Sequence, residues 1–127
     1  MSYKRLVLLK LLQDLYPGTP IACGTTYKSI ILYYTQEPLV PEATISAKYA
    51  DYTIAHNLDI LRGERNSRLT KSDIYALPDF PHKSAELKQQ WLNYRQSLRD
   101  ITTTYPMPDT DADDNLIGIV WPEKPVA

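Results

Sequence analysis

Hydrophobic positions recur at helical spacing in three separate stretches of the chain. The first stretch extends from about residue 3 to residue 15, and its leucines fall at i, i+3, i+4 and i+7: Leu8, Leu11, Leu12 and Leu15. This spacing places the leucines on one face and predicts an amphipathic helix. Tyr16, Pro17 and Gly18 come next and predict the end of the helix, because proline and glycine interrupt helical structure.

A pair of extended segments is expected after this helix. Residues 19–23 and 28–34 are rich in β-branched and aromatic side chains, which predicts two strands, and Gly24, Thr25 and Thr26 predict the turn between them. Apolar and aromatic residues occupy both faces of the second strand. We therefore expect one face to be covered and the other to contact a partner, with Tyr33 and Tyr34 as candidate contact residues.

The second helical stretch begins near Glu42, after a linker bracketed by Pro38 and Pro41. Residues 43–69 predict one helix about 40 Å long at 1.5 Å per residue, with Gly63 as a weak point. Its apolar positions are spaced 3, 4, 4 and 3 and form one stripe: Ala47, Ala50, Ile54, Leu58 and Leu61. This apolar stripe needs a partner surface. The N-terminal helix and hairpin comprise about 35 residues, which is too few to cover the stripe or to form a stable fold alone. Two alternatives stay open: a homo-oligomer through the 43–69 helix, or a helix that folds back onto the C-terminal half.

The third helical stretch follows Pro78 and Pro81 and ends near residue 101. Ser84 is a candidate N-cap, and the apolar positions are spaced 4, 3, 4 and 3, as on a helix that packs along one seam: Leu87, Trp91, Tyr94, Leu98 and Ile101. The tail after it is rich in proline and acidic as far as Asp114, and residues 116–121 predict a short strand.

These elements predict an α+β protein in three parts. A small helix and β-hairpin module occupies residues 1–40, a long helix occupies 41–72, and a helical module with an extended Pro-rich tail occupies 73–127.

Charge argues against a general nucleic-acid binder. The chain has 14 Lys and Arg against 15 Asp and Glu, a net charge of −1, so it has no overall attraction to a phosphate backbone. Arg62, Arg65 and Arg68 recur every three residues on the second helix, and we expect them to pair with acids such as Asp73 or Asp79 or to be solvated.

No stretch reaches the roughly 18 apolar residues that a membrane-spanning helix needs, so no membrane is expected as a partner. Cys23 is the only cysteine, which excludes an intrachain disulfide and favours a cytoplasmic protein. Ten tyrosines fit a protein-binding surface, because tyrosine offers an apolar ring with a polar end.

Candidate chemistry is sparse. Cys23, His56 and His82 are the only cysteine and histidines, which is too few for a typical metal site, and motifs for phosphate or dinucleotide binding are missing. We therefore expect no enzyme, no cofactor and no metal centre.

The acidic run 109–114 resembles part of a calcium loop. Asp109, Asp111, Asp113 and Asn115 match loop positions 1, 3, 5 and 7, but Asp114 replaces the glycine at position 6 and Val120 replaces the glutamate at position 12. A solvated acidic loop is favoured, and whether it binds a cation stays open.

The C-terminal half resembles the phage tail assembly chaperone family, also called tail fibre assembly proteins. The resemblance runs from Arg62 through the Ser72-Asp73 pair and Leu77-Pro78-Asp79 to a central string and a closing motif: Trp91-Leu-Asn-Tyr94-Arg95-Gln96-Ser-Leu98-Arg99-Asp100, then Val120-Trp121-Pro122-Glu-Lys-Pro125. Ile74 departs from the family, which usually has tryptophan directly after the Ser-Asp pair, so this chain lacks that aromatic anchor.

The resemblance implies a non-enzymatic phage protein that binds a tail or tail-fibre subunit and assists its folding or assembly in the host cytoplasm. The alternative is a stoichiometric component of the virion tail, baseplate or fibre that stays bound after assembly. Arg95 and Arg99 would bridge Asp73, Asp79 or carboxylates of a partner. The candidate partner-binding residues, with the two tyrosines above, are these: Trp91, Tyr94, Arg95, Leu98, Arg99, Trp121 and Pro122.

Overall fold

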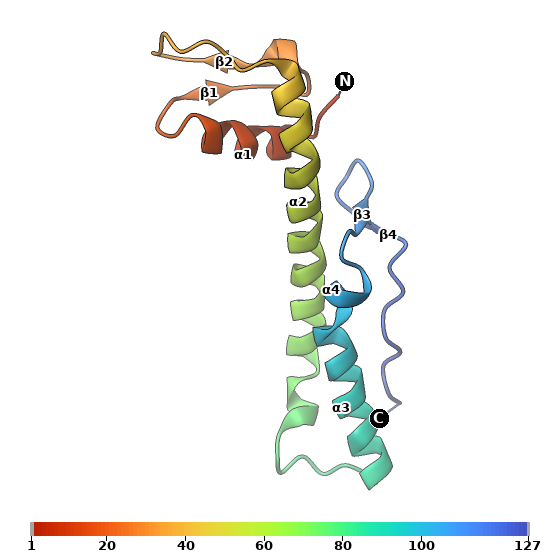
Figure 1. The fold of residues 1–127 in the computed structure, drawn as a ribbon. Coiled ribbons are helices and arrows are strands. Elements are labelled where there is room, and N and C mark those ends of the chain that lie inside the picture. Colours follow the sequence, from red (N-terminus) through yellow and green to blue (C-terminus); the bar gives the residue numbers. More distant parts are fainter. Residues whose placement is uncertain (1, 127) are drawn as a thin grey trace. The chain divides into compact units, whose positions relative to one another are not determined.

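The computed structural model describes residues 2–126 and divides the chain into two compact units, the first ending at His56 and the second beginning at Asn57. Helices, a long one among them, and short antiparallel hairpins make up the fold, which confirms the predicted α+β class (Figure 1). The boundary between the units falls within the long helix α2 (Glu42–Lys71). The predicted division into 1–40, 41–72 and 73–127 concerns domains and stays a prediction.

The core of the first unit forms around helix α1 (Arg5–Leu15). Leu8, Leu11 and Leu12 are fully buried, as their spacing predicts, and they form one cluster with Ile45 from the first turns of α2. Burying each of these leucines contributes about 1.5–3 kcal/mol relative to an exposed position. The first unit therefore depends on packing between α1 and the beginning of α2.

The predicted hairpin is present but shorter than expected. Strands β1 (Ile21–Ala22) and β2 (Ile31–Leu32) pair antiparallel, with Ile21 opposite Leu32. Residues 28 and 29, which the sequence predicts in the second strand, belong instead to the 3₁₀ turn η1 (Tyr27–Ser29). The Ser29 hydroxyl accepts a hydrogen bond from the Gly24 amide at 2.8 Å and donates to the Thr26 carbonyl at 2.5 Å. These local bonds compete with strand pairing and explain the turn.

Helix α2 confirms the long helix predicted over residues 43–69, and it continues through Gly63 without a break. The predicted apolar stripe is wrong at its beginning, because Ala47 and Ala50 are exposed. Ile45, Tyr49 and Tyr52 face the core of the first unit instead. Alanine buries little area, so the larger side chains determine which face is covered.

The second unit packs helix α3 (Ala85–Arg99) against the last turns of α2, which end in the 3₁₀ turn η2 (Asp73–Ala76) (Figure 1). The Ser84 hydroxyl accepts a hydrogen bond from the Leu87 amide at 3.0 Å, which confirms the predicted N-cap. After Asp100 the chain forms one further turn, α4 (Ile101–Thr104). Of the two alternatives for α2, packing onto the C-terminal half is therefore observed, whereas the homo-oligomer stays a prediction.

A second hairpin follows α4. Strands β3 (Asp109–Thr110) and β4 (Leu116–Ile117) pair antiparallel, so the strand predicted over 116–121 ends early. Within the residues described, no helix combines the length and the apolarity that crossing a membrane requires.

Candidate functional site

Aromatic side chains form the centre of the second unit. The rings of Tyr75 and Trp91 stack with centroids 3.7 Å apart, and Tyr94 meets Trp91 edge-on at 5.8 Å. Trp91 is 1% exposed, and Tyr94 and Leu98 are buried beside it. These three predicted partner-binding residues therefore form the core beneath the surface, and a direct contact between any of them and a partner stays a prediction.

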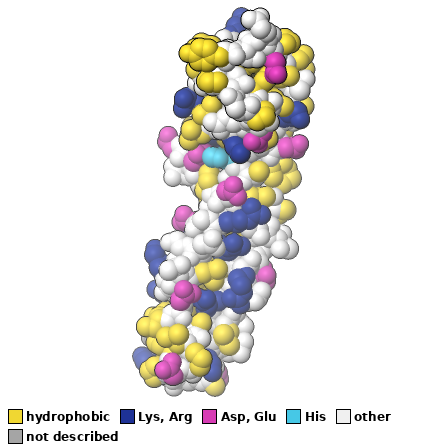
Figure 2. Space-filling view, turned by 90° about the vertical axis from the view of Figure 1, so that its left-hand side faces the viewer, with side chains coloured by type: hydrophobic (Ala, Val, Ile, Leu, Met, Phe, Trp, Pro, Cys, Tyr) yellow, Lys and Arg dark blue, Asp and Glu magenta, His cyan; other side chains and the backbone are white. Residues whose placement is uncertain are grey.

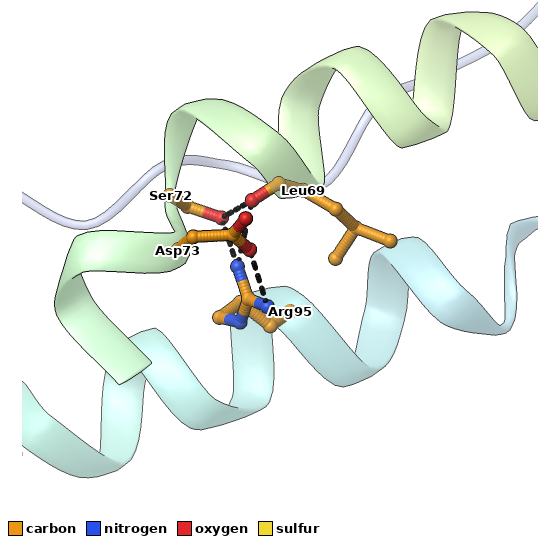
Figure 3. Close-up of polar contacts among 4 residues, drawn as sticks. All are labelled: Leu69, Ser72, Asp73 and Arg95. Carbon is orange, nitrogen blue, oxygen red and sulfur yellow. Dashed lines mark hydrogen bonds and ion pairs between the residues drawn. The ribbon is translucent and has the colours of Figure 1, made fainter. Parts of the chain in front are cut away.

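Arg95 joins α3 to the end of α2 (Figure 3). One guanidinium nitrogen donates to the Leu69 carbonyl at 2.8 Å and to the Ser72 hydroxyl at 2.7 Å, and the other donates to the Asp73 carboxylate at 2.9 Å. The last carbonyls of a helix have no partner within the helix, so a cation placed there also complements the helix dipole. This observation confirms the predicted pair with Asp73.

Arg99 lies one turn further along α3 and differs from Arg95 in its contacts. Its guanidinium donates to the Gln96 side chain at 2.8 Å and 3.2 Å, and the residue is exposed. Its predicted contact with a partner's carboxylate therefore stays open to test. Two arginines of α2 form ion pairs within the helix, Arg62 with Asp59 at 3.3 Å and Arg68 with Glu64 at 3.8 Å. The expected pairing with neighbouring acids is therefore observed, but with acids other than Asp73 and Asp79.

The C-terminal strip, residues 119–126, carries Trp121 and Pro122, both half-buried. Trp121 packs against the aromatic core, and the Arg68 guanidinium carbon lies 4.2 Å from the centroid of its ring. A cation over an indole face is a favourable electrostatic contact. Trp121 thus holds the strip on the second unit and at the same time orients Arg68.

A groove of about 510 Å³ lies between α3 and the strip. Apolar Pro122, Pro125 and Val126 line it from the strip together with charged Glu123 and Lys124, and the α3 wall is polar: Gln90, Asn93 and Ser97. Tyr94 belongs to the lining as well. The groove therefore combines apolar side chains with side-chain amides that donate and accept hydrogen bonds.

A smaller pocket of about 270 Å³ shares Tyr94 and Lys124 with this groove. Three cations line it, Arg68 and Lys71 from α2 and Lys124 from the strip, together with a single acid, Glu64. On the face drawn in Figure 2, several Lys and Arg side chains lie close together, with Asp and Glu side chains among them.

Tyr33 and Tyr34, the predicted contact residues of the first unit, are 43% and 96% exposed. Their rings lie 6.2 Å apart, and Tyr34 has a positive φ of 57°, which is uncommon for a bulky residue. The Tyr33 amide donates to the Pro20 carbonyl at 2.9 Å, which fixes the backbone at this point. Tyr27 instead packs on the core and donates to the Val40 carbonyl at 2.6 Å.

Cys23 belongs to the core of the first unit, whereas Trp91 and Trp121 belong to the second. Burial raises the pKa of the Cys23 thiol, and the nearby Arg5 guanidinium opposes this only in part. The raised pKa disfavours the thiolate, which is the nucleophilic form. His82 contacts the Tyr75 carbonyl at 3.0 Å within the second unit.

The acidic run forms a turn that is stabilised by hydrogen bonds between its own residues. One Asp111 oxygen accepts from the amides of Asp113 and Asn115, both at 2.9 Å, and the other accepts from the Asn115 side chain at 3.2 Å. Across residues 2–126 no group of three or more His, Cys, Asp or Glu is arranged to hold a metal ion.

Asn57 is a buried residue that the sequence did not reveal as important. Its side-chain amide donates to the Pro108 carbonyl at 3.1 Å, and its oxygen accepts from the Thr110 hydroxyl at 2.9 Å. These bonds attach the β3–β4 hairpin to α2 across more than 50 residues of sequence. Polar residues on a helix are usually solvated, so no local signal marks this one.

Comparison with known proteins identifies a family that the C-terminal half matches. Residues 58–126, more than half of the chain, match the model of the family described as phage tail assembly chaperone protein. No curated protein and no solved structure matches the chain significantly. The matched range begins one residue after Asn57 and contains the aromatic core, the Arg95 contacts, the groove and the basic pocket. The chain therefore belongs to the phage tail assembly chaperone family.

Proposed function

We propose that this protein binds a subunit of the phage tail or tail fibre and assists its folding or assembly. Membership of the family supports a role in tail assembly. We propose in addition that the protein binds one such subunit directly. The groove between α3 and the C-terminal strip supports this binding.

The chemistry of the groove fits a polypeptide segment. At about 510 Å³ it is large enough for several side chains, and Pro122, Pro125 and Val126 offer apolar contact. Gln90 and Asn93 on the opposite wall can hydrogen-bond the backbone of an extended segment. Protein-binding surfaces commonly combine apolar contact with hydrogen bonds, and the two walls of this groove offer both.

An unassembled tail subunit would benefit from such a contact. Subunits that mature by oligomerisation expose apolar surface and unpaired strand edges before they assemble, and both features promote aggregation. A protein that covers one such segment keeps the subunit soluble until its partners replace the contact. Tyr33 and Tyr34 offer a second exposed aromatic surface in the first unit for the same kind of partner.

Co-expression tests this proposal. Each tail and tail-fibre subunit of the same phage is produced alone and together with the chain, and the soluble fraction and co-purification are measured. We expect at least one subunit to become soluble and to co-purify with the chain. If no subunit changes its solubility and none co-purifies, the proposal is wrong.

Ser97→Trp tests whether the groove is the binding surface. Ser97 is exposed on α3 and lines the groove, so an indole at this position fills the space that a partner would occupy. Lys88→Trp is the matched control, because Lys88 is exposed on the same helix and lines neither cavity. Loss of co-purification in Ser97→Trp alone supports the groove, whereas equal binding by both variants excludes it.

Mass spectrometry of purified particles separates transient assistance from the alternative, a permanent virion component. A released assembly factor is absent from mature particles, whereas a structural component is present at a fixed copy number. We expect absence, as the proposed assisting role implies.

A further inference from the structure

The basic pocket beside the groove has an excess of positive charge that the chain itself does not neutralise. Lys71 and Lys124 are exposed, and neither ammonium group contacts a carboxylate among the described residues. Glu64 is the single acid of the lining, and its carboxylate lies 3.8 Å from Arg68. The lining therefore carries a net charge of +2 beside two aromatic side chains, Trp91 and Tyr94.

Arg68 is held in place but is incompletely hydrogen-bonded. The Trp121 ring lies 4.2 Å from its guanidinium carbon, and its Nε atom is buried without a hydrogen-bond partner. At 3.8 Å, the contact with Glu64 is an ion pair that is too long for a good hydrogen bond. The guanidinium is thus oriented at the pocket with its hydrogen-bonding capacity largely unused.

The volume of the basic pocket limits the size of the group that it can bind. Its volume of about 270 Å³ lies just below the range of roughly 300–1,000 Å³ that is typical of small-molecule sites. One amino-acid side chain fits this space. The pocket also shares Tyr94 and Lys124 with the groove, so a segment lying in the groove can place one side chain in the pocket.

From this arrangement we infer that the pocket receives a carboxylate side chain from an acidic segment of the tail subunit. The inference rests on the proposed function and adds the chemistry of the segment. Arg68, Lys71 and Lys124 supply the positive charge, and arginine provides a planar fork that matches a carboxylate. The flanking residues of the segment lie along Pro122, Pro125 and Val126.

Charge also argues against nucleic acid as the ligand. A nucleic-acid site needs a broad field of cations along the backbone, whereas this pocket has three cations with an acid among them, in a chain of net charge −1. A single carboxylate reduces this local excess from +2 to +1.

Peptide binding tests the inference directly. Overlapping fluorescent peptides that cover the tail and tail-fibre subunits of the phage are titrated with the full chain, and the dissociation constants are measured by anisotropy. We expect the peptides that bind to contain Asp or Glu. Replacing that acid by its amide, or combining Lys71→Gln with Lys124→Gln, is expected to weaken binding by about 2- to 30-fold, the range for losing two exposed ion pairs.

The control variant removes the same two positive charges from lysines outside the pocket and the groove. Lys83 and Lys88 are exposed and line neither cavity, so Lys83→Gln combined with Lys88→Gln should bind as the unchanged protein does. Circular dichroism of each variant verifies that it is folded. Because Lys71 and Lys124 have exposed side chains, their replacement by glutamine is expected to leave the fold intact.

Two results would overturn the inference and leave the proposed function standing. In the first, peptides bind, but neither their acids nor Lys71 and Lys124 affect the affinity. In the second, no acidic peptide binds although a full-length subunit still co-purifies with the chain. Failure of both the peptides and the full-length subunits to bind would reject the proposed function together with this inference.

Discussion

The thiol of Cys23 illustrates how the surroundings of one residue determine its chemistry. It lies in the core of the first unit, where removal from water raises its pKa above the ordinary value of 9.0. The Arg5 guanidinium donates to the Cys23 carbonyl at 2.9 Å, and its charge opposes the shift without overcoming it. The side chain therefore acts as a small apolar core residue over the physiological pH range.

A pH-dependent loss of stability follows from this raised pKa. The unfolded chain loses the thiol proton at a lower pH than the folded chain, so folding binds protons in that interval, and stability falls as pH rises above about 9. We expect the melting temperature to fall less steeply between about pH 8 and about pH 10 in Cys23→Ala than in the unchanged protein. Equal slopes in thermal melts of the two proteins would contradict this assignment.

Tyr52 contributes in the same direction at higher pH. Its hydroxyl donates to the Asp14 carboxylate at 2.7 Å, and this bond raises the pKa of Tyr52 from its ordinary value of 10.0. The same bond is the main cause that lowers the pKa of Asp14, followed by the contact with Lys10. Because Cys23→Ala leaves this pair unchanged, the difference between the two melts isolates the thiol.

Among the elements, the end of α2 depends on a side chain from another helix. Arg95 reaches the Leu69 carbonyl and the Ser72 hydroxyl, and Ser72 is itself buried and donates to the same carbonyl at 3.0 Å. The Arg95 side chain is 14% exposed, whereas that of Asp73 is 63% exposed. The hydrogen bonds to the helix end are therefore shielded from water far better than the ion pair is.

Substitutions at this contact should differ in their effect on stability. Arg95→Ala is expected to lower the free energy of unfolding by about 1.5–3 kcal/mol, the range for hydrogen bonds made by a charged group. Asp73→Asn should lower it by less than about 1 kcal/mol, because the exposed ion pair is screened by solvent. Urea denaturation measures both values.

Arg99→Ala is the matched control for Arg95→Ala, because Arg99 lies on the same helix and donates only to Gln96 in the described structure. It should change stability by no more than about 0.5 kcal/mol. If Asp73→Asn is as destabilising as Arg95→Ala, the ion pair rather than the helix-end contact holds the two elements together.

In the molecule as a whole, two compact cores belong to one chain. Leu11 is fully buried in the first core and Leu98 in the second, and α2 contributes Ile45 to the first and Leu69 to the packing of the second. Both tryptophans, Trp91 and Trp121, lie in the second unit. Tryptophan fluorescence therefore reports the second unit, while circular dichroism reports the helices of both.

This distribution allows the two units to be followed separately. Leu11→Ala should cost about 2–5 kcal/mol in the first core, so that circular dichroism begins to change before tryptophan fluorescence does on heating. Leu98→Ala removes the same number of atoms from the second core and should shift the fluorescence transition to lower temperature. Coincident transitions in Leu11→Ala would show that the chain unfolds as one cooperative unit.

The sequence by itself determined the helices, the α+β class and the family resemblance, which the family match confirms over residues 58–126. Leucine spacing in α1, the Ser84 cap and the seam of α3 were all predictable, because each depends on residues within a few positions of one another. Local signals also suffice to place the turn after α1.

Only the tertiary structure decided which partners the long-range side chains take. Asn57 holds a hairpin more than 50 residues away, Arg95 reaches the end of α2, and Lys124 joins Arg68 and Lys71 at one pocket. It also placed Ile45, Tyr49 and Tyr52, rather than Ala47 and Ala50, against the first core. The physical reason is the same in each case: these contacts depend on which surfaces meet after the chain has folded, and spacing along the sequence carries no information about that.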